Sequence, residues 1–483
     1  MREAVTITVG TVVGVGLFTT GGNIVGMMGY SVIIATFLAM VISIYPALMY
    51  AEMGAALPYA GGTYKYASLG MGRPFGMLAG WNFIISLVAV TSGEALAFSF
   101  YFKTLVSALG FEIPGGDTSD IIIACVMIAV FMFFSVRGNE LTGRLQNAFM
   151  FFFWGVAIVW FLTMIPNVQI GNFAQLPADV DFSPSNFIAM VAMIWWCYAG
   201  FETCCAMGEE IKYPHINIPR ALFLAPFIVF AVNAIFQWFL VAIVPTDQLS
   251  AIAEASAPYA EAMQTAGILG FPLIMLAAGV AFGGDFSTLN SSISVPPRYL
   301  FTMARDGAMP KVFAKISEKY KTPYVAIITL GVLTILLTAT GSINYIASLS
   351  LFADLFYYVI GIFACMFLRK KRPDLDRPYK APGIKVLGPV SAIIYLIMMT
   401  QLDSNAFITG AIWCVLGLII YFICRSKYGD TDDAELDAAV VARVEPSPAE
   451  KAKMDKEFKL WRNVVIVAVV IALALYVVPF LCN

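Results

Sequence analysis

Long runs of apolar residues recur from Val5 to Leu481, and they limit the possible folds of this chain more than any other feature. Of its 483 residues, 60% are hydrophobic and 12% are charged, whereas a soluble globular protein carries about 25% charged residues. A helix of roughly 20 apolar residues crosses a bilayer core. Because a helix satisfies its own backbone in lipid, and the alternating segments of a membrane β-barrel are absent, we expect an all-α integral membrane protein.

Thirteen stretches are apolar and long enough to be read as membrane spans. They lie at 5–29, 31–56, 76–102, 120–137, 146–165, 187–207, 221–244, 267–296, 324–340, 344–368, 386–402, 405–424 and 463–481. A polar segment at 425–462 sets the last stretch apart. No cleavable leader is expected, because the first apolar run follows Arg2 and Glu3 directly and is too long for a signal sequence.

Positive charges fall in alternate connections between these stretches. The basic positions are Lys65, Arg73, Arg137, Arg144, Lys212, Arg220 and the groups at 298–321 and 369–385, and the intervening connections are acidic apart from Lys103. By the positive-inside rule, the basic connections and the N-terminus are cytoplasmic. The sequence therefore predicts a multi-pass protein of the cell (inner) membrane, embedded in the lipid bilayer.

Two of the apolar runs are interrupted by small residues about halfway along. The first interruption contains Gly14 and Gly16, and the second contains Gly200. Glycine weakens a helix, and backbone that leaves the helical form inside a membrane must line a cavity or meet a ligand. Two such breaks about 185 residues apart are typical of carriers built from inverted repeats. The structural alternative is that these glycines only allow helices to pack closely.

Several motifs, in the right order, resemble the amino acid-polyamine-organocation (APC) superfamily. The resemblance extends from about residue 8 to 425 and is carried by segments 14–18, 50–58, 61–64, 200–202, 209–214, 218–220, 298–307, 321–323 and 368–383. It implies an amino acid permease that works by alternating access, as a symporter or an exchanger.

The resemblance also implies a LeuT-like fold with a 5+5 inverted repeat. The repeats would be 1–165 and 187–368, followed by spans eleven and twelve at 386–424. A cytoplasmic tail at 425–462 and an extra C-terminal span at 463–481 would complete twelve core helices and a thirteenth. Substrate would bind where the first and sixth spans are broken.

Backbone groups at the two breaks suit the two ends of an amino acid. The positive end of a half-helix favours a carboxylate, and the negative end favours an ammonium group. We expect substrate contacts from Val13, Gly14, Val15 and Gly16 in the first break and from Trp196, Tyr198, Ala199 and Gly200 in the second. Trp196 resembles an aromatic residue beside the substrate in arginine and agmatine exchangers. An ordinary packing role for this tryptophan stays open.

Three carboxyl groups in the predicted spans are candidates for coupling or gating. Glu94 resembles the acidic position of proton-coupled permeases, Glu202 follows the second break, and Asp285 lies beside Ser287 and Thr288. An acidic group inside a membrane is unfavourable and is functional by default. The structural alternatives are a buried carboxyl bonded to neighbouring hydroxyls or, for Glu202, one that caps freed amides.

One departure from the family pattern leaves the coupling ion open. Relatives often carry a lysine in the fifth span that replaces a sodium ion, and here that position is Phe153. Coupling to H⁺, coupling to Na⁺ and ion-free exchange all remain, and no cofactor is expected. The loop from Lys103 to Asp120 has no cysteine, so no disulfide-linked heavy chain is expected.

The leading prediction is a secondary carrier of a small molecule, an amino acid or an amine. The alternatives are an amine or polyamine exchanger of the same fold, a non-transporting sensor, or a channel. An enzyme and a nucleic-acid partner are not expected, because no P-loop or nucleophile pattern is present. His215 is the single histidine, so no histidine-based metal cluster is expected.

Overall fold

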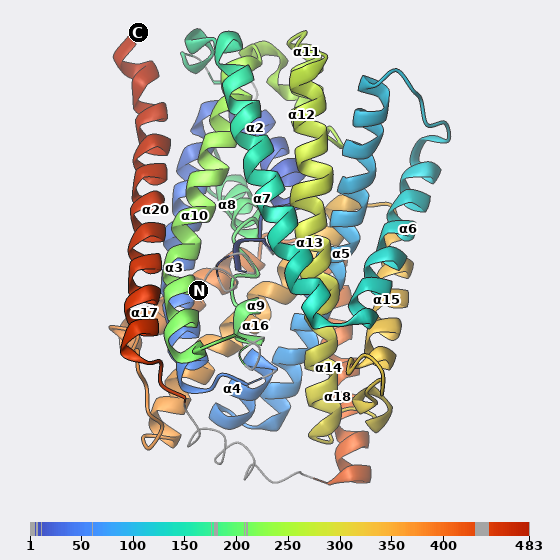
Figure 1. Cartoon of the computed structure of the whole chain (residues 1–483), viewed down its shortest axis with the longest axis vertical. Coiled ribbons are helices and arrows are strands. Elements are labelled where there is room, and N and C mark those ends of the chain that lie inside the picture. The colour runs from blue at the N-terminus through green and yellow to red at the C-terminus, as the bar shows by residue number, and fades with distance from the viewer. Residues whose placement is uncertain are drawn as a thin grey trace.

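The computed structural model describes residues 5, 8–10, 12–59, 61–174, 176–177, 182–206, 208, 211–429 and 444–482. Within these ranges the chain contains helices and no strand, which confirms the all-α prediction. The long helices run roughly alongside one another, with α4 at one end of the bundle and α11 at the other (Figure 1).

The helices follow one another with short connections. The α-helices are α2 (Gly22–Met28), α3 (Val32–Ala56), α4 (Gly62–Gly70), α5 (Arg73–Ala108), α6 (Gly116–Arg137), α7 (Asn139–Met164), α8 (Pro184–Trp196), α9 (Thr203–Ala206), α10 (Pro214–Ile243), α11 (Pro258–Thr265), α12 (Phe271–Gly279), α13 (Phe286–Ser294), α14 (Pro296–Arg305), α15 (Tyr324–Thr338), α16 (Ile343–Lys371), α17 (Ile384–Met399), α18 (Ser404–Tyr428) and α20 (Pro448–Cys482). Two π-helical segments, η1 (Gly16–Gly21) and η6 (Val280–Asp285), and 3₁₀ turns η2 (Gly29–Ser31), η3 (Ile165–Asn167), η4 (Ile170–Phe173), η5 (Thr246–Ile252) and η7 (Lys311–Ala314) complete the described part.

Nine helical stretches among the described residues are long and apolar enough to cross a membrane, and three shorter apolar helices accompany them. The long ones are Gly16–Ala56, Arg73–Ala108, Gly116–Arg137, Gly143–Asn167, Pro214–Ile243, Phe271–Arg305, Ile343–Lys371, Ser404–Tyr428 and Pro448–Val477, and the shorter ones are α8, α15 and α17. Each predicted apolar run overlaps one of these helices, although residues 5–15 and 197–207 of two runs lie outside them. The protein is therefore a multi-span membrane protein.

Local sequence sets several helix ends. Gly72 has a φ of 115°, and Pro74 follows at the start of α5, where its missing N–H is not needed. The Asp403 side chain accepts the amides of Asn405 and Ala406 and so caps α18.

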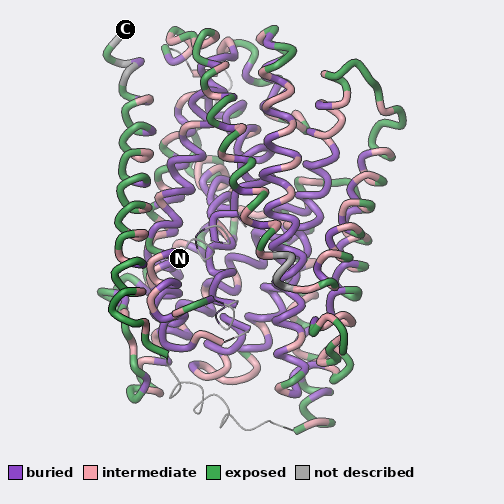
Figure 2. The backbone as a smooth tube through the Cα atoms, in the orientation of Figure 1, coloured by how far each residue is buried: buried purple, intermediate pink, exposed green. Residues whose placement is uncertain are grey.

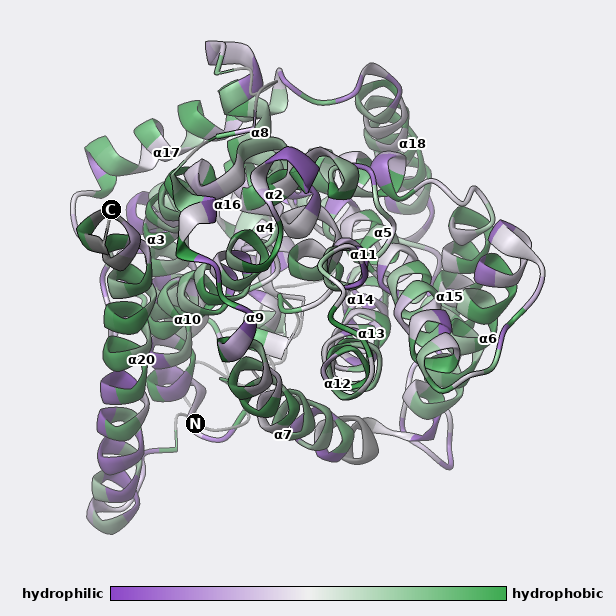
Figure 3. Cartoon of the chain, turned by 90° about the horizontal axis from the view of Figure 1, so that it is seen from above, coloured by the Kyte–Doolittle hydropathy of each residue, from purple (hydrophilic) through white to green (hydrophobic). Residues whose placement is uncertain are grey.

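The surface of the bundle is apolar where a lipid-facing protein requires it. Figure 2 shows buried residues through the centre, with exposed ones on α20 and along α6. Figure 3, seen from above, shows hydrophobic residues around the periphery as well as inside. Leu162, Ile412 and Val467 are more than half exposed, at 63%, 63% and 57%. Such faces are unfavourable in water and favourable against acyl chains.

The predicted tail at 425–462 is partly helical. Helix α18 continues to Tyr428, residues 430–443 lie outside the described part, and α20 begins at Pro448. The basic stretch and the predicted last span thus form one continuous helix, because no glycine or proline separates them. Lys212 binds Glu450 at 2.8 Å and Arg220 binds Asp455, so this helix is attached to the start of α10.

Candidate functional site

The first predicted interruption is confirmed at residues 12–14. The amide of Val13 still donates to Val9 O at 3.0 Å, the next residues leave the helical form, and η1 begins at Gly16. The amide of Val15 donates to Glu94 Oε1 at 2.7 Å. A Cβ at Gly14 would lie 2.6 Å from Glu94 Cδ, so only glycine leaves room for this carboxylate.

The second predicted interruption is confirmed between α8 and α9. Residues 197–202 form turns, with Gly200 at a φ of 96°. The carboxylate of Glu202 accepts the hydroxyls of Tyr357 and Tyr358, and the amide of Gly200 donates to Tyr358 Oη at 3.2 Å. Glu202 is therefore tied to α16 by two hydroxyl donors.

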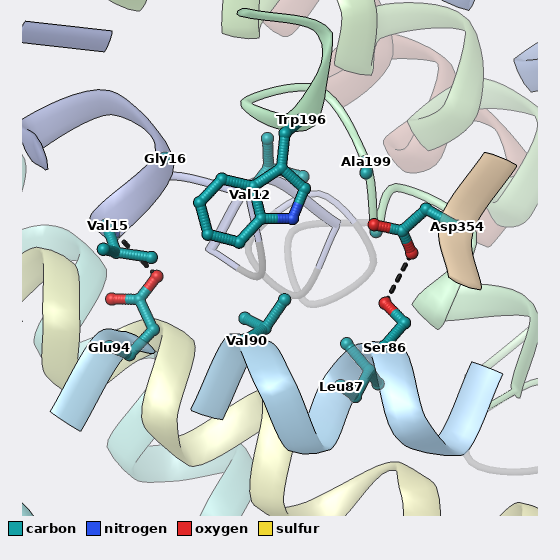
Figure 4. Close-up of a pocket in the computed structure, with 11 residues that line it drawn as sticks. Val12, Val15, Gly16, Ser86, Leu87, Val90, Glu94, Trp196, Ala199 and Asp354 are labelled. Atoms are coloured by element: carbon teal, nitrogen blue, oxygen red, sulfur yellow. Dashed lines mark hydrogen bonds between the residues drawn. The ribbon is translucent and has the colours of Figure 1, made fainter. Parts of the chain in front are cut away.

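The two interruptions meet at a small cavity, shown in Figure 4. Cys197 Sγ donates to Gly16 O at 2.9 Å, so the broken segments touch directly. The cavity is lined by Val12, Val15, Gly16, Ser86, Leu87, Val90, Glu94, Trp196, Ala199, Gly200 and Asp354. Its free volume of about 20 Å³ holds about one water molecule, so side chains or helices must move to admit an amino acid.

Some of the predicted substrate residues line this cavity, and others lie behind it. Val15, Gly16, Trp196, Ala199, Gly200 and Glu94 are in the lining, whereas Val13, Gly14 and Tyr198 are not. The hydroxyl of Tyr198 points away and donates to Thr36 O at 2.9 Å. Trp195 also faces elsewhere, against Tyr395.

Two polar lining residues, Ser86 and Asp354, were missed by the sequence prediction, as were the apolar residues Val12, Leu87 and Val90. Ser86 Oγ donates to Asp354 Oδ1 at 2.5 Å, and Asp354 is only 2% exposed. The sequence contained a signal for Asp354. An acidic group inside a membrane is unfavourable, and this argument, which singled out Glu94, applies equally to an aspartate within the predicted span 344–368.

Trp196 separates the two carboxyl groups of the cavity. Figure 4 shows its indole ring between Glu94 and Asp354. Its Nε1 donates to Ser350 Oγ at 3.0 Å, and this bond fixes the ring plane.

Asp285 lies outside the cavity lining and faces Glu94 from η6. The two carboxyl groups are close enough to interact electrostatically, since η6 packs against α5. Glu94 Oε2 and both oxygens of Asp285 are buried, and no donor from the described residues reaches them. Two bare carboxylates in this position would repel each other strongly, so the contact requires a proton or another positive charge.

Ser287 and Thr288 belong to a separate group of oxygen atoms behind the first interruption. Ser287 Oγ donates to Gly10 O at 3.1 Å, and Thr288 Oγ1 lies 3.0 and 3.2 Å from the carbonyl oxygens of Gly10 and Val13. Gln146 Nε2 donates to Ser287 Oγ at 2.7 Å.

The α7 residue that reaches this oxygen group is thus Gln146. It is not Phe153, which corresponds to the lysine position of the relatives. Phe153 packs edge-on against Phe18 with ring centroids 5.7 Å apart.

The two ends of the bundle differ in how they enclose the site. Toward α11, a cavity of about 820 Å³ is lined by residues such as Thr20, Asn23 and Asn186. Toward α4, aromatic side chains fill the space: Tyr50 lies edge-on to Tyr358 at 5.4 Å, and further pairs join Tyr50 to Phe201 and Phe83 to Tyr299. Among the described residues, aromatic side chains thus pack across the α4 end, whereas the α11 end is hollowed.

Ion pairs add to the closure at the α4 end. Lys65 pairs with Asp306, and the buried carboxylate of Glu52 pairs with Arg369 and, at 3.4 Å, with Arg377. Glu209 lies outside the described residues.

Comparison with known proteins places this architecture among carriers. Residues 1–425 match the family model described as amino acid permease. The chain is 23% identical over 447 residues to the branched-chain amino acid permease BcaP of Bacillus subtilis, covering 87% of this chain and 91% of that protein. It is 24% identical to the methylthioribose transporter of the same organism (87% and 91% covered) and 25% identical to its serine/threonine exchanger SteT (86% and 92%).

Proposed function

We propose, from the premise that this chain belongs to the amino acid permease family, that it is a secondary active transporter which moves amino acids or related amines across the cell membrane by alternating access. The observation that carries the proposal is the cavity where Cys197 of one interrupted segment touches Gly16 of the other. Backbone groups released from helices inside a membrane are stabilised when a ligand binds them.

The fold that we propose is LeuT-like, with 1–165 and 187–368 as inverted repeats. The remaining parts are spans eleven and twelve at 386–424, the tail at 425–462 and a thirteenth span at 463–481. Two observations support it. Each interruption falls in the first span of its repeat, and α3 packs along α10, as the second spans of two repeats related by a two-fold axis would.

The orientation that we propose puts the α4 end in the cytoplasm. Lys65, Arg298 and Arg369 belong to the basic connections at that end, which supports it through the positive-inside rule. In this orientation the conformation is hollowed toward the outside and closed toward the cytoplasm. Transport would require the aromatic layer around Tyr50 and Tyr358 to separate while the outer cavity closes.

Substrate binding at the first interruption competes with Glu94. The Val15 amide that would receive a substrate carboxylate is held by Glu94 Oε1. A second carboxylate can reach this amide without strong repulsion only when the Glu94 carboxyl is protonated. Binding of an amino acid and binding of a proton would then favour each other.

We therefore propose H⁺ as the coupling ion, shared between Glu94 and Asp285. A proton between these two carboxyl groups supplies the donor that their buried oxygens lack. Sodium among the oxygens of Gly10, Val13 and Thr288 is the alternative. The N–H group of Gln146 at Ser287 argues against it, because an amide donor repels a cation.

Counterflow in proteoliposomes tests the proposed function. Vesicles that hold purified protein and are loaded with unlabelled amino acids should accumulate external labelled amino acid in a saturable way. Uptake should rise when the outside is made more acidic than the lumen. The Glu94→Gln variant should keep counterflow and lose this response to the pH gradient. Ligand binding without flux would indicate a sensor, and flux that does not saturate would indicate a channel.

A further inference from the structure

Asp354 on α16 is an acidic group in the wall of the central cavity, at the opposite end from Glu94 (Figure 4). Ser86 Oγ donates to one of its oxygens at 2.5 Å. The second oxygen, Oδ2, lies 3.4 Å from Ser350 Oγ, a long contact, and the Tyr357 hydroxyl also lies close to this carboxyl group. Figure 4 shows this second oxygen directed toward Ala199. It is therefore available to accept a hydrogen bond from a ligand.

None of the described residues that line this cavity is a lysine, arginine or histidine, and two of them carry carboxyl groups. Its two side-chain donors are already engaged, Ser86 with Asp354 and the Trp196 indole with Ser350. The lining therefore offers more acceptors than donors. An acidic group enclosed in this way is stabilised by a cation.

The end of α8 favours a positive charge at the same place. Helix α8 runs for 13 residues to Trp196 and then stops, so the negative end of its dipole lies beside the cavity, although the carbonyl groups of Ile194, Trp195 and Trp196 already accept amides of the following turn. Asp354 adds a full negative charge beside them. The helix end alone would favour the ammonium group of any amino acid. The added carboxylate favours a substrate that carries a net positive charge.

The residues that line the cavity are arranged to suit an elongated ligand once helices have moved apart to admit it. Ser86, Val90 and Glu94 are spaced four residues apart on α5 and form one wall, which extends about 12 Å along the helix. The Trp196 ring lies between the two acidic ends. An alkyl chain would pack against Val90 and the ring, and a positively charged nitrogen would lie at Asp354.

We propose that Asp354 binds a positively charged nitrogen of the substrate, so that this carrier prefers cationic substrates, basic amino acids or aliphatic diamines, over neutral amino acids. The inference rests on the proposed function, because it assigns the substrate class of the same cavity.

Lysine and norleucine give the sharpest test, because they differ only in the terminal amino group. Counterflow competition with purified wild-type protein in proteoliposomes should show L-lysine or putrescine at least tenfold more potent than L-norleucine. The Asp354→Asn variant should lose this ratio. Asp120→Asn, which affects a carboxylate paired with Lys103 at 2.9 Å away from the cavity, serves as the control and should keep it.

A second variant covers the case in which Asp354→Asn does not fold. Ser86→Ala keeps the carboxylate and removes its donor, so it should still prefer lysine. The inference is overturned if wild-type protein exchanges L-norleucine as well as L-lysine, or if Asp354→Asn keeps the preference. Exchange of neutral amino acids alone would leave the proposed transport function intact, whereas no exchange of any of these compounds would overturn both.

Discussion

Glu94 Oε1 accepts the main-chain N–H of Val15 at 2.7 Å, so an acidic side chain holds the backbone of the first interrupted helix. This contact joins α5 to the segment that we expect to bind substrate. Anything that displaces the Glu94 side chain should therefore change the site without disturbing the outer helices.

Gly14→Ala is the smallest change that tests this contact. The added methyl group would collide with the Glu94 carboxylate and displace this proposed proton-binding group, so proton-driven uptake should fall more than tenfold while the protein stays monodisperse. Gly155→Ala is the matched control, because a Cβ there meets nothing within 4 Å on the exposed side of α7. Wild-type uptake by Gly14→Ala would contradict the proposed role of the contact.

Sodium should not drive transport. Gln146 Nε2 donates to Ser287 Oγ at 2.7 Å, and Asn290 Nδ2 donates to Gln146 Oε1 at 2.8 Å, so the amide is fixed with its N–H group toward the oxygen cluster. Initial uptake rates should be equal in sodium chloride and choline chloride at constant pH. A saturable increase with sodium would instead assign the oxygens of Gly10 and Val13 to a sodium site.

Glu52→Gln should destabilise the α4 end. Glu52 is 1% exposed and pairs with both Arg369 and Arg377, and removing one partner from a buried ion pair costs about 3 kcal/mol. The melting temperature in detergent should fall measurably. Asp374→Asn is the control: Arg372 lowers the pKa of Asp374, but the Asp374 side chain is 59% exposed, so a much smaller change in melting is expected at neutral pH.

The same Asp374 control has a defined pH dependence. Because the pKa of Asp374 is lower in the folded protein, its ion pair contributes above the ordinary aspartate pKa and is lost as the pH falls through the lowered value. If Asp374→Asn lowered the melting temperature at neutral pH as much as Glu52→Gln, burial would not explain the difference in stability between the two ion pairs.

Much of the fold could be predicted from the sequence, because the constraints that a bilayer imposes are local. The apolar runs predicted the helices, and the glycines at 14, 16 and 200 predicted the two interruptions. Both features depend only on residues that are close in the chain. Helix ends were less predictable. The run at 267–296 contains the π-helical segment η6, which the apolar pattern did not indicate.

The candidate site was predictable only in part. The pairing of Glu94 with Asp285, of Asp354 with Ser86, and of Gln146 with Ser287 joins residues that are 191, 268 and 141 positions apart. Family spacing pointed to Phe153 for the α7 position. The residue that reaches the oxygen cluster is Gln146, which lies about two helical turns nearer the N-terminus of that helix.

By itself the sequence determined that this chain spans a membrane as helices and that two of them are broken, because low charge and glycine placement act along the chain. Only the tertiary structure decided which acidic groups face one another and which amide Glu94 holds. Those choices depend on the rotation of each helix about its own axis, which is set by packing against neighbours that lie far away in the sequence.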